Sequence, residues 1–191
     1  MQCTEGIIKN CLKNNVKAQG KLYRTYAPKM YGICLRFAKN HQEAEDILQE
    51  GFIKVFANLK TFRNEGVFEA WIRRIMINTA INFYKRKYPA FQDIDFERWR
   101  NRRFDEDIVA GLSYNELMEC IHQLPNGYRL VFNLNAIEGY THKEISEKLN
   151  ISINTSKSQL SRARKTLQNI ISKNHKLSYP ADNLLAELIV P

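Results

Sequence analysis

The sequence predicts an all-α protein in which two small helical domains are joined by a linker. Apolar residues recur three or four positions apart along most of the chain, and no long run alternates with the period of two that marks a strand. The helical pattern breaks over residues 88–112, a stretch dense in mixed charge, and residues 174–191 form a C-terminal tail. A chain of 191 residues is long enough for two small domains.

The first predicted domain covers residues 15–87 and is a helical bundle. Three amphipathic helices are expected in it, because three stripes of apolar residues at helical spacing can bury a common core. The stripes are Leu22, Tyr26, Met30, Ile33 and Phe37; Ala44, Ile47, Leu48, Phe52, Val55 and Leu59; and Phe68, Trp71, Ile72, Ile75, Thr79 and Phe83.

The second predicted domain covers residues 113–173 and opens with another helix. An S-x-x-E capping box at residues 113–116 precedes that helix, and Pro125 ends it. The next helix is expected from about Tyr128 to Ile137, because Gly139 follows at a position where helices commonly end.

A helix-turn-helix is predicted over residues 141–171. Thr141 and Glu144 form a capping box for its first helix. Asn150 suits the left-handed backbone that ends this helix, and Ser152 suits the N-cap of the next. Two capped helices across so short a turn are typical of DNA-binding domains, although a plain hairpin with a solvated basic face shows the same pattern. In the second helix we expect Ile153, Leu160, Ala163, Leu167 and Ile170 to face inward, and Asn154, Thr155, Lys157, Ser158, Ser161, Arg162 and Lys165 to be exposed.

The net charge of +9 favours a polyanionic partner, and its distribution is more informative than its size. Residues 73–87 and 141–176 are strongly basic, whereas residues 41–50 hold four acids and no Lys or Arg. This division predicts two contacts with nucleic acid and a separate contact with a protein. No apolar run reaches the ~20 residues of a membrane span, and the N-terminus lacks the pattern of a signal peptide, so a cytoplasmic location is expected. The cysteines and histidines show no spacing typical of a metal site.

Two stretches of the chain resemble conserved regions of one protein family. The string EGYTHKEISEKLNISINTSKSQLSRARKTL, with LPNGYRLVFNL before it, is similar to the fourth conserved region of bacterial sigma factors. The strings AEDILQEGFIKVFANLKTF and FEAWIRRIMINTAINFYKRK are similar to the second region and its promoter-melting part. The extracytoplasmic-function (ECF) group is the most similar. The resemblance implies a protein that binds core RNA polymerase and directs promoter recognition, DNA melting and transcription initiation, with no catalytic residue, cofactor, metal or small-molecule substrate of its own.

Asp46, Gln49 and Glu50 lie three and four residues apart, on a helix face that points away from the apolar stripe. This face is either a solvated surface or a docking site. The resemblance implies docking on the basic coiled coil of the polymerase beta-prime clamp. It also implies a contact with the beta flap and restraint by an anti-sigma factor.

The resemblance implies that the first domain binds the minus-ten DNA strand through five residues. They are Phe62, Trp71, Arg74, Asn78 and Lys85. An aromatic surface and an amide suit a base flipped out of the duplex, and basic neighbours suit its backbone. The alternatives are that Asn78 packs locally and that Trp71 belongs to the core.

The resemblance also implies that the last helix reads duplex minus-thirty-five DNA. The residues implied are Asn154, Thr155, Lys157, Ser158, Gln159, Ser161, Arg162 and Lys165. The sequence departs from the family pattern in this helix: Ser156 replaces an inward valine, and Gln159 replaces an arginine. We expect the Ser156 hydroxyl to bond to the carbonyl one turn back.

Two other classes of protein fit parts of the pattern. A helix-turn-helix regulator that binds DNA alone would not need the acidic face or the separate basic bundle. A nuclease that uses the carboxylates of residues 43–50 would need a companion histidine, a second acidic cluster or a Gly-rich phosphate loop, and the sequence shows none of these.

Overall fold

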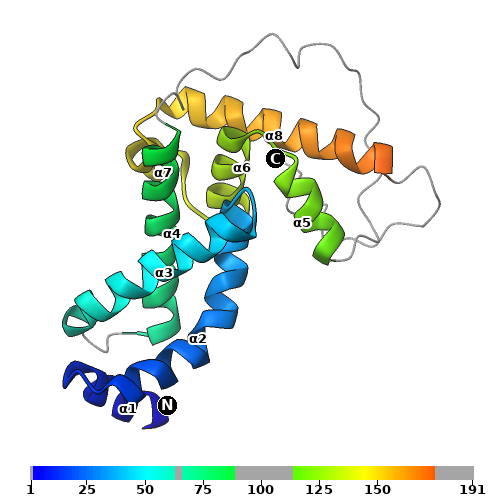
Figure 1. Ribbon diagram of the computed structural model, residues 1–191. Coiled ribbons are helices and arrows are strands. Elements are labelled where there is room, and N and C mark those ends of the chain that lie inside the picture. The colour runs from blue at the N-terminus through cyan, green and yellow to red at the C-terminus, as the bar shows by residue number, and fades with distance from the viewer. Residues whose placement is uncertain (1, 63–65, 89–113, 175–191) are drawn as a thin grey trace. The chain divides into compact units, whose positions relative to one another are not determined.

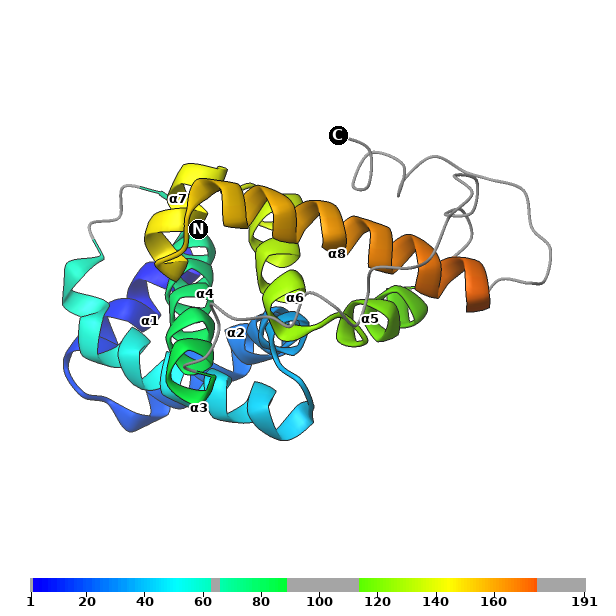
Figure 2. The same ribbon diagram turned by 90° about the horizontal axis from the view of Figure 1, so that it is seen from above.

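The computed structural model describes residues 2–62, 66–88 and 114–174 of the chain (Figures 1 and 2). These residues form helices and turns and no strand, which confirms the predicted all-α class. The chain divides into two compact units, Met1–Arg86 and Lys87–Pro191. In the described part of the chain, no helix is both long and apolar enough to cross a membrane. The predicted linker beyond Tyr88 and the tail beyond Asn174 lie outside the described residues.

The first unit is a bundle of α-helices with one short 3-10 turn. Its elements are α1 (Gln2–Leu12), α2 (Val16–Phe37), α3 (His41–Asn58), η1 (Leu59–Thr61) and α4 (Phe68–Lys87). Asparagine caps fix two of the helix starts, since Asn15 accepts from the N–H of Ala18 at 3.0 Å and Asn40 from that of Glu43 at 2.8 Å. α1 precedes the predicted bundle, and it packs against α2 and η1 through Ile8 and other residues.

The core of the first unit comes from the predicted stripes. The first two stripes are buried except for Tyr26, which is half-buried, whereas Trp71 and Ile75 of the third are also partly exposed. α4 is buried around more of its circumference than one stripe allows, because Met76, Ile77 and Ala80 are buried too. α3 and α4 approach closely at Gly51, where an added Cβ would collide with the fully buried side chain of Met76.

The second unit is built around its last helix. Its elements are α5 (Tyr114–His122), α6 (Asn126–Phe132), the π-helical turn η2 (Asn133–Ile137), α7 (His142–Leu149) and α8 (Ile153–Asn174). α8 packs against α6, α7 and α5 along its length (Figures 1 and 2).

The helix predicted from about Tyr128 to Ile137 begins two residues earlier and changes character before it ends. Pro125 is the N-cap residue of α6, so it starts this helix as well as limiting the preceding one. The last turn widens into η2, where the N–H of Glu138 bonds to the carbonyl of Asn133, five residues back, at 3.0 Å. Gly139 follows with φ of +75°, as its place after the helix predicted.

Candidate functional site

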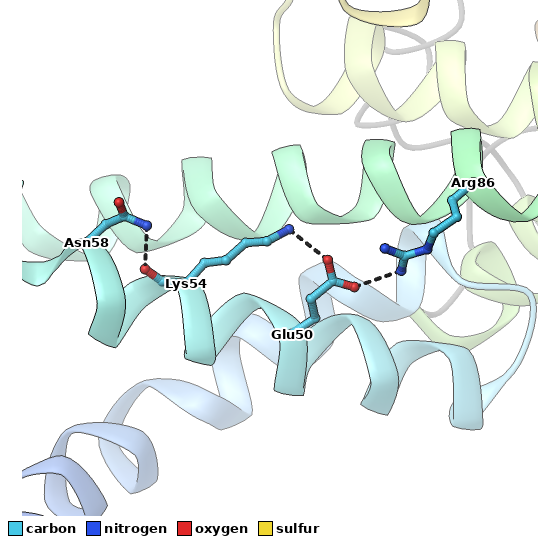
Figure 3. A network of polar contacts seen from close by, with 4 residues as sticks. All are labelled: Glu50, Lys54, Asn58 and Arg86. Carbon is cyan, nitrogen blue, oxygen red and sulfur yellow. Dashed lines mark hydrogen bonds and ion pairs between the residues drawn. The ribbon is translucent and has the colours of Figure 1, made fainter.

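The acidic face of α3 contains two exposed residues and one that is engaged within the domain. Asp46 and Gln49 are exposed. Glu50 is partly buried and accepts from Lys54 Nζ at 2.8 Å and from Arg86 Nη2 of α4 at 2.9 Å (Figure 3). Hydrogen bonds from Arg86, which has the larger effect, and from Lys54 hold the pKa of Glu50 below its usual range. The three residues predicted as one docking face are therefore not equivalent, because the Glu50 carboxylate ties α3 to α4.

Ile53 is an exposed apolar residue on the same side of α3. Its side chain is 69% exposed, and it follows Asp46 by seven residues and Gln49 by four. A groove of about 520 Å³ lies beside this face between α2 and α3, lined in part by Tyr23, Leu48 and Gln49. In the sequence, Ile53 is an apolar residue that does not belong to the inward stripe of its helix, and this could have marked it as exposed. The sequence prediction for this face included only charged and amide residues, so it did not include Ile53.

An aromatic pocket of about 470 Å³ lies at the start of α4. Its described lining is Thr61, Phe62, Gly66, Val67, Ala70, Trp71 and Arg74. The Phe62 ring lies 4.9 Å from that of Phe68 and 5.5 Å from that of Trp71, between centroids. Phe68 is buried, and it also contacts the Tyr26 ring of α2 edge to face. Trp71 is half-buried, so it both packs in this cluster and forms a wall of the pocket.

The structure brings three of the five predicted minus-ten residues into the pocket lining and leaves two outside it. Phe62, Trp71 and Arg74 line the pocket. Asn78 is half-buried one turn further along α4, and exposed Lys85 follows about two turns later. Spacings of four and seven residues place Arg74, Asn78 and Lys85 along one side of the helix. The pocket therefore opens beside a strip that runs along α4.

The helix-turn-helix is held by the local bonds that its sequence predicted. Thr141 and Glu144 form a complete capping box at α7, and these bonds lower the pKa of Glu144. Asn150 has the left-handed backbone, with φ of 57° and ψ of 46°. Ser152 Oγ accepts from the N–H of Thr155 at 2.9 Å and so caps α8.

Most predicted DNA-reading residues of α8 are accessible, but Gln159 is not. Asn154, Lys157, Ser161 and Lys165 are exposed, and Thr155, Ser158 and Arg162 are half-buried.

Gln159 is only 5% exposed, which contradicts its place among the residues that would face DNA. It follows Ser156 by three residues and precedes Ala163 by four, so it shares the inward face with them. The prediction for Ile153 was also wrong, since it is 42% exposed in the first turn of α8. Near the other end of the helix Ile171 is buried, while Ile170 is only half-buried.

Ser156 faces inward as predicted, but its partner is not the one we expected. Its hydroxyl lies 2.9 Å from Nδ1 of His142, across the interface between α7 and α8. The carbonyl one turn back, of Ser152, accepts the backbone N–H of Ser156 instead. His142 is half-buried, and burial, followed by the charges of Lys157 and Arg164, lowers the pKa of its imidazole.

Comparison with known proteins assigns both units. Residues 22–88 match the model of sigma-70 region 2, and residues 114–167 match that of sigma-70 region 4. The chain is 32% identical over 174 residues to the ECF RNA polymerase sigma factor SigW of Bacillus subtilis, covering 84% of this chain and 92% of that protein. It is 26% identical over 179 residues to the ECF sigma-E factor of Haemophilus influenzae, covering 87% and 94%.

One solved structure that matches this chain is that of the sigma factor RpoE of Bartonella quintana in complex with the anti-sigma factor NepR. That match has a TM-score of 0.49 and 21% identity, and it covers 82% of this chain and 98% of that one. The matches to sigma-70 region 2 and, after it, to sigma-70 region 4 define a sigma factor of the sigma-70 class. The chain belongs to the ECF sigma factors of bacterial RNA polymerase.

As a sigma factor the chain acts with core RNA polymerase in promoter recognition and transcription initiation, and it is not an enzyme. This assignment decides against the stand-alone regulator and the nuclease. It leaves α1 outside the matched regions, since the region 2 match begins at Leu22 in α2.

Proposed function

We propose that three surfaces of this sigma factor divide the work of initiation. The exposed face of α3 docks on the polymerase beta-prime clamp, the aromatic pocket and the α4 strip hold the minus-ten strand, and the exposed face of α8 reads minus-thirty-five DNA. The aromatic pocket is the observation that carries this proposal, because it combines ring walls with a basic residue at its edge.

The pocket suits a single unstacked base. Phe62 and Trp71 offer aromatic surfaces on which a base can stack, and Arg74 offers charge for a neighbouring phosphate. Asn78 and Lys85 extend the surface along α4, where the backbone of the displaced strand would follow. Base capture here offsets an unstacking cost on the order of a few kcal/mol.

Docking on polymerase is best supported for Asp46 and Gln49. Both are exposed, and Ile53 adds an apolar contact beside them. An acidic and apolar face suits a basic coiled coil, because opposite charges orient the two proteins and the apolar side chain excludes water from the contact. Glu50 can join this contact only by sharing or exchanging its present partners Lys54 and Arg86.

Reading of the minus-thirty-five element is proposed for the accessible residues of α8, without Gln159. The small polar residues Asn154, Thr155 and Ser158 lie in the first turns, where close approach to base edges is easiest. Ser161 and the basic residues Lys157, Arg162 and Lys165 suit phosphates or guanine. The beta flap is proposed as a further contact of this domain, from the family resemblance.

Removal of the Phe62 ring tests the pocket. Holoenzyme containing Phe62→Ala should melt a cognate promoter poorly, measured by permanganate reactivity of unpaired thymines, while binding to core polymerase is retained. Phe56→Ala is the matched control, because Phe56 is also a half-buried ring but does not line the pocket. Equal melting by Phe62→Ala and Phe56→Ala would count against base capture at this site.

The family resemblance also supports proposals on location and regulation. We propose that the chain works in the cytoplasm, where bacterial polymerase acts, and that an anti-sigma factor restrains it. Affinity purification from uninduced cells should recover the chain with such a partner and without core polymerase; recovery with polymerase alone would speak against restraint.

A further inference from the structure

We propose that His142 is a positioning residue for minus-thirty-five recognition, because its hydrogen bond to Ser156 fixes the first turn of α8 against α7. His142 is the first residue of α7, and Ser156 lies in the first turn of α8. The inference rests on the proposed function of α8. It concerns how the reading surface is held and not which residues touch the bases.

The buried hydroxyl of Ser156 is satisfied by the His142 ring. The side chain is fully buried between the helices, where an unpaired hydroxyl costs about 1–3 kcal/mol. A serine inside a helix often bonds to the carbonyl four residues back, but here the hydroxyl bonds across to the His142 ring. The bond therefore ties two helices together, where a bond to its own backbone would tie nothing.

Both ends of this bond are anchored. The Thr141–Glu144 capping box fixes the backbone at His142, and the Ser152 cap fixes the turn that contains Ser156. A displacement of Ser156 would therefore move its neighbours Thr155 and Lys157, which are proposed to face DNA. Hydrogen bonds have narrow distance and angle limits, so the pair specifies the helix angle more sharply than apolar packing alone.

The ionisation state of His142 suits this role. Burial and the nearby cations Lys157 and Arg164 keep its pKa below the ordinary value of 6.5, so the neutral form of the ring predominates at pH 7. A neutral imidazole has one N–H and one free lone pair, and a hydroxyl can both donate and accept. The pair is therefore matched in either tautomer of the ring.

The test measures base preference and not only activity. Holoenzyme is assembled from the full chain and core polymerase, and it transcribes a library of randomised minus-thirty-five sequences in front of a promoter that the parent chain uses. We expect Ser156→Ala and His142→Ala each to reduce the preference for the best sequences about fivefold, the effect of one lost hydrogen bond. The double variant should lose no more than either single one, because both remove the same bond.

Two further variants separate positioning from general damage. His142→Asn places an amide near the position of Nδ1, so it should restore much of the preference that His142→Ala loses. Ser172→Ala is the matched control, since the Ser172 hydroxyl donates to the Gln168 carbonyl of the same helix, at 2.7 Å, and its loss should leave the preference unchanged. A uniform drop in transcription from all library members, or additive losses in the double variant, would overturn the inference.

Asn154→Ala separates this inference from the function on which it rests. If Asn154→Ala alters base preference and His142→Ala does not, only the positioning role is wrong. If neither Asn154→Ala nor Lys157→Ala alters it, α8 does not read the element, and both proposals fail.

Discussion

At the turn between α7 and α8, Asn150 has the left-handed backbone conformation, which is energetically unfavourable for residues that have a Cβ. Its N–H donates to the carbonyl of Ser146, whose hydroxyl donates to the carbonyl of Ile151 at 2.7 Å. Asparagine tolerates this conformation better than other residues except glycine. The turn is therefore set by local chemistry before any DNA is present.

Two substitutions at this turn should have opposite consequences. Asn150→Ala should lower the free energy of unfolding of the second domain by about 1 kcal/mol, because alanine resists the left-handed region. Asn150→Gly should preserve or slightly raise it. Urea unfolding of the full chain, followed by a probe in the second domain, checks both; equal stability of the two variants would contradict the argument.

The Glu50 carboxylate should contribute to stability in a pH-dependent way. Its pKa is lower in the folded protein than the ordinary value of 4.5, so its contribution is fully present above that value. The contribution is lost as the pH falls through the folded pKa, where the carboxylate becomes protonated and releases Arg86 and Lys54.

Replacement of Glu50 by Gln tests this contribution. The difference in stability between parent and Glu50→Gln should shrink as the pH is lowered below about 4.5, measured by urea unfolding across the acid range. Glu45→Gln is the control, an exposed acid on the same helix. A difference that stays constant with pH would show that the network does not depend on the charge of Glu50.

At the scale of elements, the sequence predicted best where local chemistry decides the outcome. The caps of α7 and α8 and the left-handed Asn150 follow from short-range bonds, and the structure confirms them. α1 was missed because its amphipathic pattern is short, and the predicted first domain began only at residue 15. Gln159 was misplaced because the family resemblance puts a DNA-facing arginine at this position, whereas its spacing from Ser156 and Ala163 places it on the inward face of α8.

Other features depended on contacts that no sequence pattern records. The pocket forms because η1 brings Phe62 against Phe68 and Trp71 of α4. The pairing of His142 with Ser156 depends on the crossing of two helices. Whether Glu50 is free or engaged depends on Arg86, which lies 36 residues further along the chain.

The exposed face of α3 predicts a loss of docking when its charge is reversed. Asp46→Lys should weaken binding to core polymerase by about tenfold or more, because it places like charges against the basic partner. The change leaves the Glu50 network intact, so the first domain should stay folded. Competition with another sigma factor for core polymerase measures the effect.

Glu147→Lys is the matched control for this prediction. It makes the same charge change at an exposed position on α7, outside the proposed docking face. If the two variants bind core polymerase equally well, the docking face is wrongly placed.

At the scale of the whole molecule, the net charge of +9 is divided among separate tasks. The acid-rich helix α3 carries the proposed contact with protein, while the basic segments in α4 and α8 carry the proposed contacts with DNA. Because these tasks occupy different surfaces, a substitution in one should leave the others intact. This separability is what a sigma factor requires, since it must hold polymerase and promoter together.

Asn78→Ala tests that separation. It should slow open-complex formation on a cognate promoter while affinity for core polymerase stays at the parent level, because Asn78 belongs to α4 and is not one of the residues of the proposed docking face on α3. Promoter melting and core binding are measured on the same preparation. Parent-like melting would remove Asn78 from the strand-binding surface, and a parallel loss of core binding would show that the two tasks are coupled.

The passage from α3 into η1 has a consequence for where transcripts begin. α3 ends at Asn58, its C-cap Leu59 opens η1, and the N–H of Phe62 bonds back to the carbonyl of Leu59 at 3.3 Å. The proposed docking helix and the proposed base-holding ring are thus successive parts of one hydrogen-bonded stretch of backbone. Under the proposed function, this stretch sets the distance between the clamp and the captured nucleotide, and with it the number of bases from the minus-ten element to the first transcribed base.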